Sequence, residues 1–444
     1  MNKYIASIII VMTLASPAMS AQYYVRTDGN NANTGLADNA GGAWATMKKA
    51  VDTMVAGDTA TVNDGTYVEG TMRFNNNGTA LNPITLKAKN KHLAILSSTS
   101  GCAGNIEPNA SYIVIDGIRT QMDATNVPCG TQNSLAGTGI RCFEGNVPTT
   151  VSPSTTNHHV WIKNTRHDAS VNRGYSIKCG GDGTIVEGNI AYNGMETGAG
   201  LNMIYRDNQI LGTAYAGAGF ASKFGGRNTQ FYNNYVLCAL NFGDCVYMGG
   251  SSSDGNFFDD VADVECYNCL AYNNVIVAAP GLANEAAVGL RGCKDCLFAF
   301  NTIVGAPIAL TNTTGGGTGA IKPINPTYYN NTLTSTGVCK HASFLTNYTG
   351  TLTVDYNNFY LCTSPPTQAH GVTGDPRLRT NYTLKLSSPL RDRGVAITTW
   401  PAYGGGTTTL DLSTEPTWQD AGFTGRPSGT GFDIGAYEST NACP

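Results

Sequence analysis

Two short segments with the same spacing carry the side chains best suited to chemistry in this sequence. Lys178-Cys-Gly-Gly-Asp182-Gly-Thr and Lys223-Phe-Gly-Gly-Arg227-Asn-Thr align without a gap, and Arg291 occurs at a similar distance before a later asparagine. Basic side chains bind carboxylates, and a lysine can also move protons. Lys178, Lys223 and Arg291 therefore predict a basic stripe that suits an acidic sugar chain, and Arg227 lies just beyond Lys223.

Weaker candidates surround this stripe. Arg206 lies between the two segments, and the ring of Tyr247 can stack on a sugar, so both are candidates for substrate binding. Asp259, Asp260 and Asp263 are close together in one segment, and calcium takes several oxygen ligands. A calcium site is therefore one prediction for this segment, and an exposed acidic loop is the alternative.

Carboxylates and histidines offer a second chemistry. Asp182, Asp207 and Asp244 are an alternative set for a glycoside hydrolase, which needs two carboxylates. His167 and the pair that precedes it, at 158–159, could act as acid–base groups, although such histidines are more often surface residues.

The cysteines allow two interpretations. Cys266-x-x-Cys269 and Cys293-x-x-Cys296 have the spacing of a zinc site, but the pairs are 27 residues apart, about one unit of the repeat described next. That offset stacks each cysteine near its counterpart, which favours disulfides or core thiols over a metal or redox site. Thirteen cysteines in all are typical of an oxidising compartment, and the odd number leaves at least one outside intrachain pairing.

An internal repeat indicates how these residues are positioned. Strand-forming residues precede an asparagine in eight copies, at Asn164, Asn189, Asn208, Asn234, Asn274, Asn301, Asn331 and Asn358. Such a period is typical of a solenoid, with asparagine at a sharp bend because it tolerates left-handed backbone, and with amides bonding along a column. An antiparallel sandwich would not place asparagine at the same point of successive copies. The sequence therefore predicts an all-β fold, a right-handed parallel β-helix.

The ends of the chain have a different character. A lysine, a short apolar run and small residues make 1–20 a predicted signal peptide, so 21–362 would form the β-helix domain and 363–444 an irregular C-terminal capping region. Residues 43–51 have helical periodicity and fit an N-terminal cap before a first strand at 57–62. We therefore expect a secreted, periplasmic or cell-surface protein with no integral membrane segment after cleavage.

Composition narrows the choice of partner. The net charge is −4, only 13% of residues are charged, and no block of basic residues occurs. Proteins that bind nucleic acid carry such basic patches, so nucleic acid is excluded as an expected partner.

Motifs near both ends resemble a known group. Near the start are Tyr23-Tyr24-Val25, Asp28-Gly29, Trp44-Ala45-Thr46 and Gly65-Thr66-Tyr67-Val68-Glu69, and near the end are Ser388-Pro389-Leu390 and Asp433-Ile434-Gly435-Ala436-Tyr437-Glu438. These segments resemble the opening and closing signatures of secreted right-handed parallel β-helix proteins. The group includes polysaccharide lyases of the pectate lyase, chondroitinase B and alginate lyase type, as well as glycoside hydrolases, phage tailspikes and adhesins.

The resemblance implies a function as well as a fold. It suggests a lyase that cleaves a uronate-containing, acidic polysaccharide by β-elimination, with Lys223 as the base and Arg227 or Arg291 on the carboxylate or the leaving oxygen. Calcium would be the cofactor if the carboxylate is neutralised by a metal. Two alternatives stay open, a glycan-binding adhesin without catalysis and a β-helix glycoside hydrolase.

Overall fold

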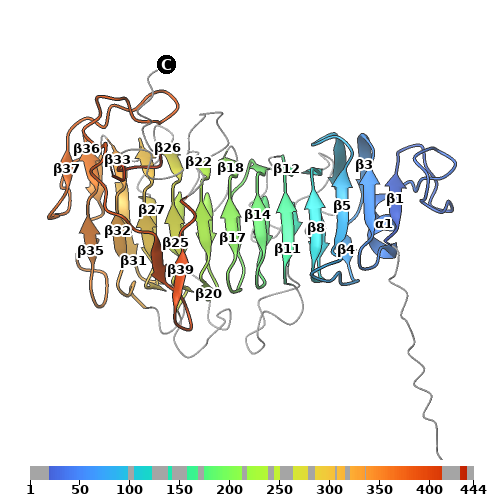
Figure 1. The fold of residues 1–444 in the computed structure, drawn as a ribbon, viewed down its shortest axis with the longest axis horizontal. Helices are drawn as coiled ribbons and strands as arrows, with labels where there is room; N and C mark the ends of the chain where they lie inside the picture. The colour runs from blue at the N-terminus through green and yellow to red at the C-terminus, as the bar shows by residue number, and fades with distance from the viewer. Residues whose placement is uncertain are drawn as a thin grey trace, which may run out of the picture.

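On each coil, the chain contributes one short strand to each of three parallel sheets, and the coils stack into an elongated solenoid (Figure 1). The computed structural model describes residues 20–98, 105–122, 139–142, 158–168, 175–212, 218–238, 245–250, 264–278, 286–305, 308–315, 321–335, 337–412 and 431–437. All the pairings along the three sheets are parallel, with consecutive coils as neighbours. The right-handed parallel β-helix predicted from the repeat is confirmed.

The first long sheet, sheet A, has 12 strands. In spatial order they are β1 (Gln22–Val25), β2 (Thr59–Val62), β5 (Ile84–Ala88), β8 (Ile113–Asp116), β11 (Val160–Lys163), β14 (Ile185–Glu187), β17 (Ile204–Arg206), β21 (Gln230–Tyr232), β25 (Leu270–Tyr272), β29 (Leu297–Ala299), β32 (Thr327–Tyr329) and β35 (Thr353–Asp355).

Sheet B, which follows sheet A on each coil, also has 12 strands. They are β3 (Gly65–Glu69), β6 (Ala94–Ser98), β9 (Arg119–Met122), β12 (Arg166–His167), β15 (Ile190–Ala191), β18 (Gln209–Leu211), β22 (Tyr235–Cys238), β26 (Val275–Ala278), β30 (Thr302–Val304), β33 (Thr332–Thr334), β36 (Asn358–Tyr360) and β37 (Val372–Thr373).

Sheet C has 10 strands and completes each coil. They are β4 (Met72–Phe74), β7 (Ile106–Pro108), β10 (Ile140–Arg141), β13 (Ile177–Cys179), β16 (Met195–Thr197), β19 (Phe220–Ser222), β23 (Val246–Gly249), β27 (Ala286–Arg291), β31 (Ile308–Thr313) and β34 (Val338–Lys340). Between sheets C and A, three coils add a corner strand: β20 (Gly226–Arg227), β24 (Cys266–Tyr267) and β28 (Cys293–Lys294).

The core is built by strand alternation. In β8 and β11 every second residue is buried, and the register stacks Ile113 under Val160 and Ile115 under Ile162. Because side chains alternate between the faces of a strand, this register keeps one face in the core over many coils. Aromatic rings extend the same stacking, with the ring centres of the paired Phe298 and Tyr328 5.9 Å apart. Rings from different sheets also meet in the core, with the ring centres of Phe220 and Phe231 3.9 Å apart.

A column of asparagine side chains runs along the corner between sheets A and B. The Nδ2 of Asn208 donates to Oδ1 of Asn234 over 3.0 Å, and the Nδ2 of Asn234 donates in turn to Oδ1 of Asn274. Six such asparagines, each bonded to the next, are Asn189, Asn208, Asn234, Asn274, Asn301 and Asn331. The predicted stacking of amides is therefore confirmed for these copies.

Two details of that prediction were wrong. At the ends of the column the participating residues are Thr165 and Asn357, one position from the predicted Asn164 and Asn358. Within the column the left-handed backbone lies one residue earlier than expected, because Asn233, with φ 56°, makes the bend and Asn234 turns its side chain into the core. At Asn164, with φ 55°, the predicted asparagine itself makes the bend. Phe300 takes the same conformation, so the bend does not require asparagine.

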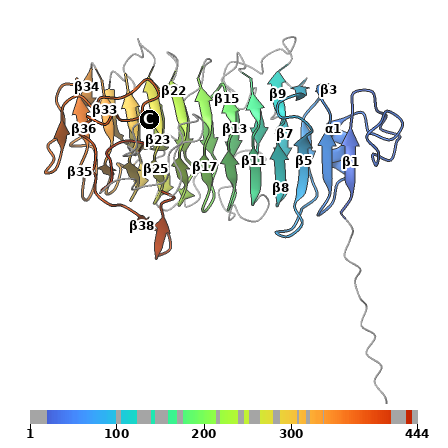
Figure 2. The ribbon, with the colours of Figure 1, turned by 45° about the horizontal axis from the view of Figure 1, so that its top comes forward.

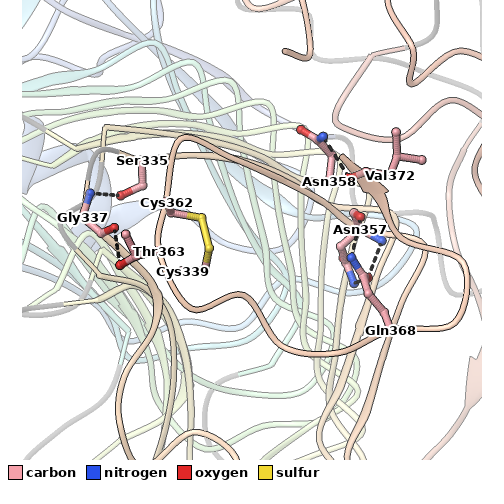
Figure 3. Close-up of a disulfide and its surroundings, with 9 residues drawn as sticks. All are labelled: Ser335, Gly337, Cys339, Asn357, Asn358, Cys362, Thr363, Gln368 and Val372. Atoms are coloured by element: carbon pink, nitrogen blue, oxygen red, sulfur yellow. Dashed lines mark hydrogen bonds between the residues drawn. A yellow bond between two sulfur atoms is a disulfide. The ribbon is translucent and has the colours of Figure 1, made fainter. Parts of the chain in front are cut away.

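A glutamine ends the column (Figure 3). The backbone N–H of Asn357 donates to Oε1 of Gln368 over 3.0 Å, so Gln368 replaces the amide of a further coil. The disulfide between Cys339 and Cys362 fastens the last coils beside it. This arrangement satisfies the polar groups that an open end would expose.

The remaining C-terminal residues return along the outside of the solenoid. The hairpin of β38 (Thr399–Pro401) and β39 (Thr407–Thr409) lies beside β25 (Figures 1 and 2). Trp400 donates its indole N–H to the carbonyl of Asp295, and Leu410 and Leu412 pack on apolar side chains outside sheet A. Sheet A is thus covered on its outer face in this region.

A short helix closes the N-terminal end, but it begins later than predicted. The helix α1 spans Met47–Thr53, and Thr46 caps it by accepting from the N–H of Lys49. The preceding residue Trp44 instead bridges to Val25 of β1, which pairs ahead of the predicted first strand. Residues 1–19 of the predicted signal peptide lie outside the described residues. Within the residues described, no helix is long and apolar enough to cross a membrane.

Candidate functional site

Five successive coils of sheet C place charged side chains at the same position. The register pairs Arg73 with Glu107, Arg141 with Lys178, and Lys178 with Glu196. Salt bridges join them, with Arg73 Nε 2.6 Å and Arg141 Nη1 3.8 Å from the two carboxylate oxygens of Glu107. We call this series the charged column of sheet C.

The charged column ends abruptly. The next residues in the same register are Ala221, Tyr247, Gly289 and Thr311. Small side chains at Ala221 and Gly289 flank the single ring of Tyr247. The surface therefore changes from charged to small and aromatic along the solenoid axis.

Glu196 is the centre of the cluster at this junction. Its side chain is 2% exposed, the ammonium of Lys178 contacts Oε1, and Nζ of Lys223 lies 3.6 Å from Oε2. Burial alone would raise the pKa of Glu196, but the positive charges of Lys178 and Lys223 outweigh it and hold that pKa below its usual value. Tyr175 adds a hydrogen bond to the same carboxylate. Glu196 is therefore ionised at neutral pH.

Lys223 reaches this carboxylate across a glycine. A Cβ at Gly250 would lie 2.4 Å from Cε of Lys223, so only glycine leaves room for the extended lysine. Burial alone would lower the pKa of Lys223, but the negative charges of Glu196 and Glu265 outweigh it, and the pKa is raised. Lys223 consequently carries a proton at neutral pH.

Aromatic rings surround the two ammonium groups. Nζ of Lys178 and of Lys223 lie 5.1 Å and 5.0 Å from the ring centre of Phe224. Arg291 lies 5.1 Å above the ring of Tyr247, and its Nε donates to Thr313. Such contacts between cations and rings stabilise charge away from water.

Lys178 and Lys223 do not share a column, contrary to the prediction. The register pairs Lys178 with Glu196, and Glu196 with Ala221. Lys223 comes two residues after Ala221 along the chain, and its column continues through Gly249 to Arg291. The prediction counted back from the asparagines and assumed corners of equal length. The corner before β21 is longer because it contains β20. Long side chains bring Lys178 and Lys223 to one carboxylate despite this offset.

Two predicted members of the site face other surfaces. Arg227 lies in β20, past a corner at which Phe224 has φ 61°, and its guanidinium is 4.3 Å from the ring centre of Tyr403. Arg206 lies on sheet A, where it pairs with Glu187 over 2.6 Å. The structure thus brings together four of the predicted residues, Lys178, Lys223, Arg291 and Tyr247. We call these four residues, together with Tyr175, Glu196, Phe224 and Glu265, the sheet C cluster.

The predicted calcium ligands Asp259, Asp260 and Asp263 lie outside the described residues. In the sheet C cluster, both oxygens of Glu196 face ammonium groups, which is not the oxygen cage that calcium prefers. The cluster therefore does not fit calcium, and its lysines supply the positive charge.

The alternative carboxylates do not form a pair in the described chain. Asp182 accepts from the N–H of Leu201 in the turn that precedes sheet A. Asp207 makes the bend at the asparagine corner, and Asp244 is not among the described residues. This arrangement gives no support to the glycoside hydrolase set.

Sequence reasoning missed Glu196 and Tyr175, and it grouped Glu265 with the acidic segment at 254–263 instead of with these lysines. Glu196 and Glu265 are each buried, at 2% and 0% exposure. No local pattern distinguishes them, because their partners come from other coils. The signal that could have found Glu196 is its place in the third-strand register, next to Lys178.

Comparisons with known proteins show the fold. No protein-family model matches the chain, and no curated protein matches it. A GH136 lacto-N-biosidase from Eubacterium ramulus superposes with a TM-score of 0.50 at 11% identity, covering 80% of this chain and 67% of that one. At this identity the likeness establishes the β-helix and not the activity.

Two further solved structures are similar over most of their length. The pectate lyase Pel9A has a TM-score of 0.47 at 16% identity, covering 94% of this chain and 96% of that one. An alginate lyase from Paenibacillus sp. str. FPU-7 has a TM-score of 0.43 at 16% identity, covering 70% of this chain and 96% of that one.

Proposed function

We propose that this protein is a secreted, carbohydrate-active enzyme that binds a uronate-containing polysaccharide on the outer face of sheet C and cleaves it by β-elimination. The observation that carries the proposal is the concentration of positive charge there. In the described part of the chain, the charged column and the sheet C cluster together hold five basic side chains (Arg73, Arg141, Lys178, Lys223 and Arg291) and three carboxylates (Glu107, Glu196 and Glu265). The whole chain, by contrast, has a net charge of −4. An anionic chain is the ligand that such a local surplus attracts.

The buried carboxylate supports a functional role. Burying ions costs free energy, and apolar residues of similar size would stabilise the coils as well or better. Glu196 holds Lys178 and Lys223 in fixed positions, with each ammonium also facing the ring of Phe224. Fixed cations of this kind are preorganised for a carboxylate ligand.

β-Elimination needs a base, a proton donor and groups that bind the uronate carboxylate, and we assign different residues to these roles. A base takes the proton from C5, the C4–O bond breaks, a C4=C5 double bond forms, and the leaving oxygen takes up a proton. Lys223 is protonated in the free protein, so we assign it and Arg291 to the uronate carboxylate, with Lys223 as proton donor. Tyr247, whose ring lies beside Arg291 and interacts with Lys223, is assigned as the base.

The test is ultraviolet absorbance of the unsaturated product. Purified protein is mixed with pectate, alginate or a glycosaminoglycan, and we expect absorbance to rise with one of them, with or without chelator. Tyr247→Phe should abolish turnover but retain binding, whereas Lys223→Met should weaken binding at least tenfold. Lys163→Met, which removes a lysine from sheet A, is the matched control and should behave as the unaltered protein.

Three outcomes would overturn the proposal. New reducing ends without ultraviolet absorbance would indicate hydrolysis. Glycan binding without product would indicate an adhesin. Absence of binding to every acidic glycan would assign the sheet C cluster to stability alone.

A further inference from the structure

Four cysteines meet inside the solenoid at the corner between sheets C and A. Cys266 is in β24 and Cys293 in β28, paired in register, and Cys269 and Cys296 follow each of them by three residues. All four side chains are fully buried and none is in a disulfide. Their side chains belong to the hydrophobic core, whereas Glu265, the residue before Cys266, belongs to the sheet C cluster.

The sulfur positions match a tetrahedral metal site. The Sγ atoms of Cys266, Cys293 and Cys296 lie within 4.8 Å of one another, and those of Cys266 and Cys296 are 3.6 Å apart. A zinc ion with four sulfurs at about 2.3 Å places neighbouring sulfurs about 3.8 Å apart. The Sγ of Cys269 lies outside this close group of three, 3.6 Å from Oγ of Ser222, and it also interacts with the sulfurs of Cys266 and Cys296.

A backbone donor completes the resemblance to a thiolate site. The N–H of Cys269 points at Sγ of Cys296 over 3.4 Å. Such a donor stabilises negative charge on sulfur in a place that water cannot reach. The two Cys-x-x-Cys segments thus supply four sulfurs and a backbone hydrogen bond to one of them, Sγ of Cys296.

Other cysteines in the same fold behave differently. Cys142 and Cys179 also lie at matching positions on neighbouring coils, and they form a disulfide with their Cα atoms 4.4 Å apart. Stacking in register is therefore compatible with a disulfide in this solenoid. Cys266 and Cys293 share that stacking, yet Cys266 directs its sulfur to Cys296, the cysteine of the other pair. Convergence on one point is what a shared ion requires and what two separate disulfides do not.

We propose that Cys266, Cys269, Cys293 and Cys296 bind one structural zinc ion. Four sulfurs leave no open position, so the ion is not catalytic. It would fasten the two-residue strands β24 and β28 to each other at their corner. The site is independent of the proposed glycan activity.

Metal analysis and thiol mapping test this assignment together. Full-length protein exported to an oxidising compartment and purified without chelator should contain one zinc per chain. After denaturation without reductant, alkylation should modify all four cysteines. Cobalt substituted for zinc should give the intense bands of a tetrahedral thiolate complex. Iron in place of zinc, disulfides between the two pairs, or four free thiols without metal would each overturn the proposal.

A variant pair separates metal binding from general stability. Cys296→Ser should lower the zinc content to below a tenth of the original and lower the melting temperature. Cys238→Ser combined with Cys245→Ser removes the disulfide between those residues and should keep the full zinc content. If Cys296→Ser does not fold, the cobalt spectrum of the unaltered protein decides the question. Zinc retained by a folded Cys296→Ser protein would contradict a four-sulfur site.

Discussion

The asparagine column and the charged column are two products of the same stacking, and they differ in kind. In the asparagine column one residue type repeats, every amide bonds to the next, and the series is neutral. In the charged column the residue type changes on every coil and the charges stop at Ala221. A repeated amide can hydrogen-bond the backbone at the corner of every coil, whereas a cluster that does not repeat is confined to a few coils. Breaks in the repeat therefore indicate where this solenoid has acquired a site.

The two columns also differ in energetic terms. Neutral amides lose little on burial when each donor has an acceptor. Buried ions lose much of their hydration, which neighbouring charges only partly repay. Changes in the asparagine column should thus affect stability alone, and changes in the charged column should affect stability and binding together.

Removing one amide from the asparagine column should have the largest effect on stability. Asn234→Ala deprives Asn208 of its acceptor and the carbonyls of Tyr205 and Tyr232 of a donor, all in the buried corner. We expect the free energy of unfolding to fall by about 4 kcal/mol, measured by denaturant titration. Exposed Asn39→Ala is the control, with a change of at most about 0.5 kcal/mol. A loss below about 1 kcal/mol for Asn234→Ala would contradict a structural column.

Neutralising the centre of the charged column should cost somewhat less. Glu196→Gln leaves the ammonium groups of Lys178 and Lys223 without their shared anion, and we expect a loss of about 3 kcal/mol in the free energy of unfolding. Combining it with Lys223→Met removes one unpaired charge and should restore part of that loss. A double-mutant cycle by denaturant unfolding measures this coupling. Strict additivity would show that Glu196 and Lys223 do not interact.

Acid should destabilise the protein through His167, a buried neutral histidine that contacts Thr165 at the end of the asparagine column. Burial lowers the pKa of His167 to about 3, and its ring nitrogens lie 2.8 Å and 2.7 Å from the hydroxyls of Thr120 and Thr165. Below pH ~6.5 the unfolded state binds a proton that the folded state refuses, so stability falls as pH falls, by about 2 kcal/mol at pH 5. The contribution is fully present above pH ~6.5, and it ceases to change below about pH 3.

The measurement is the free energy of unfolding between pH 8 and pH 4. His167→Gln lowers stability throughout but should flatten this slope, because glutamine does not titrate. Lysine neighbours hold the pKa of Glu196 below its usual value, so the unfolded state binds a proton at this carboxyl before the folded state does, and this contribution near pH ~4.3 remains in His167→Gln. An equal slope in His167→Gln and in the unaltered protein would assign the acid sensitivity to other groups.

The sequence predicted the solenoid well and the site only in part. Spacing between asparagines is a local property, so eight copies were enough to predict stacked coils. The relative position of Lys178 and Lys223 depended on corner length, and β20 shifted it by two residues. His167 was expected at the surface more often than inside, and its 1% exposure shows how little a single residue type reveals about burial.

By itself, the sequence determined the class of fold, the column of amides and the stacking of Cys266 on Cys293, since all three follow from spacing along the chain. Only the tertiary structure decided which charges meet. Glu196 lies 18 residues after Lys178 and 27 before Lys223 in the chain, and it contacts both because consecutive coils lie about 4.8 Å apart. Distance along the chain sets the period of the coils, and corner length sets which side chains face one another across them.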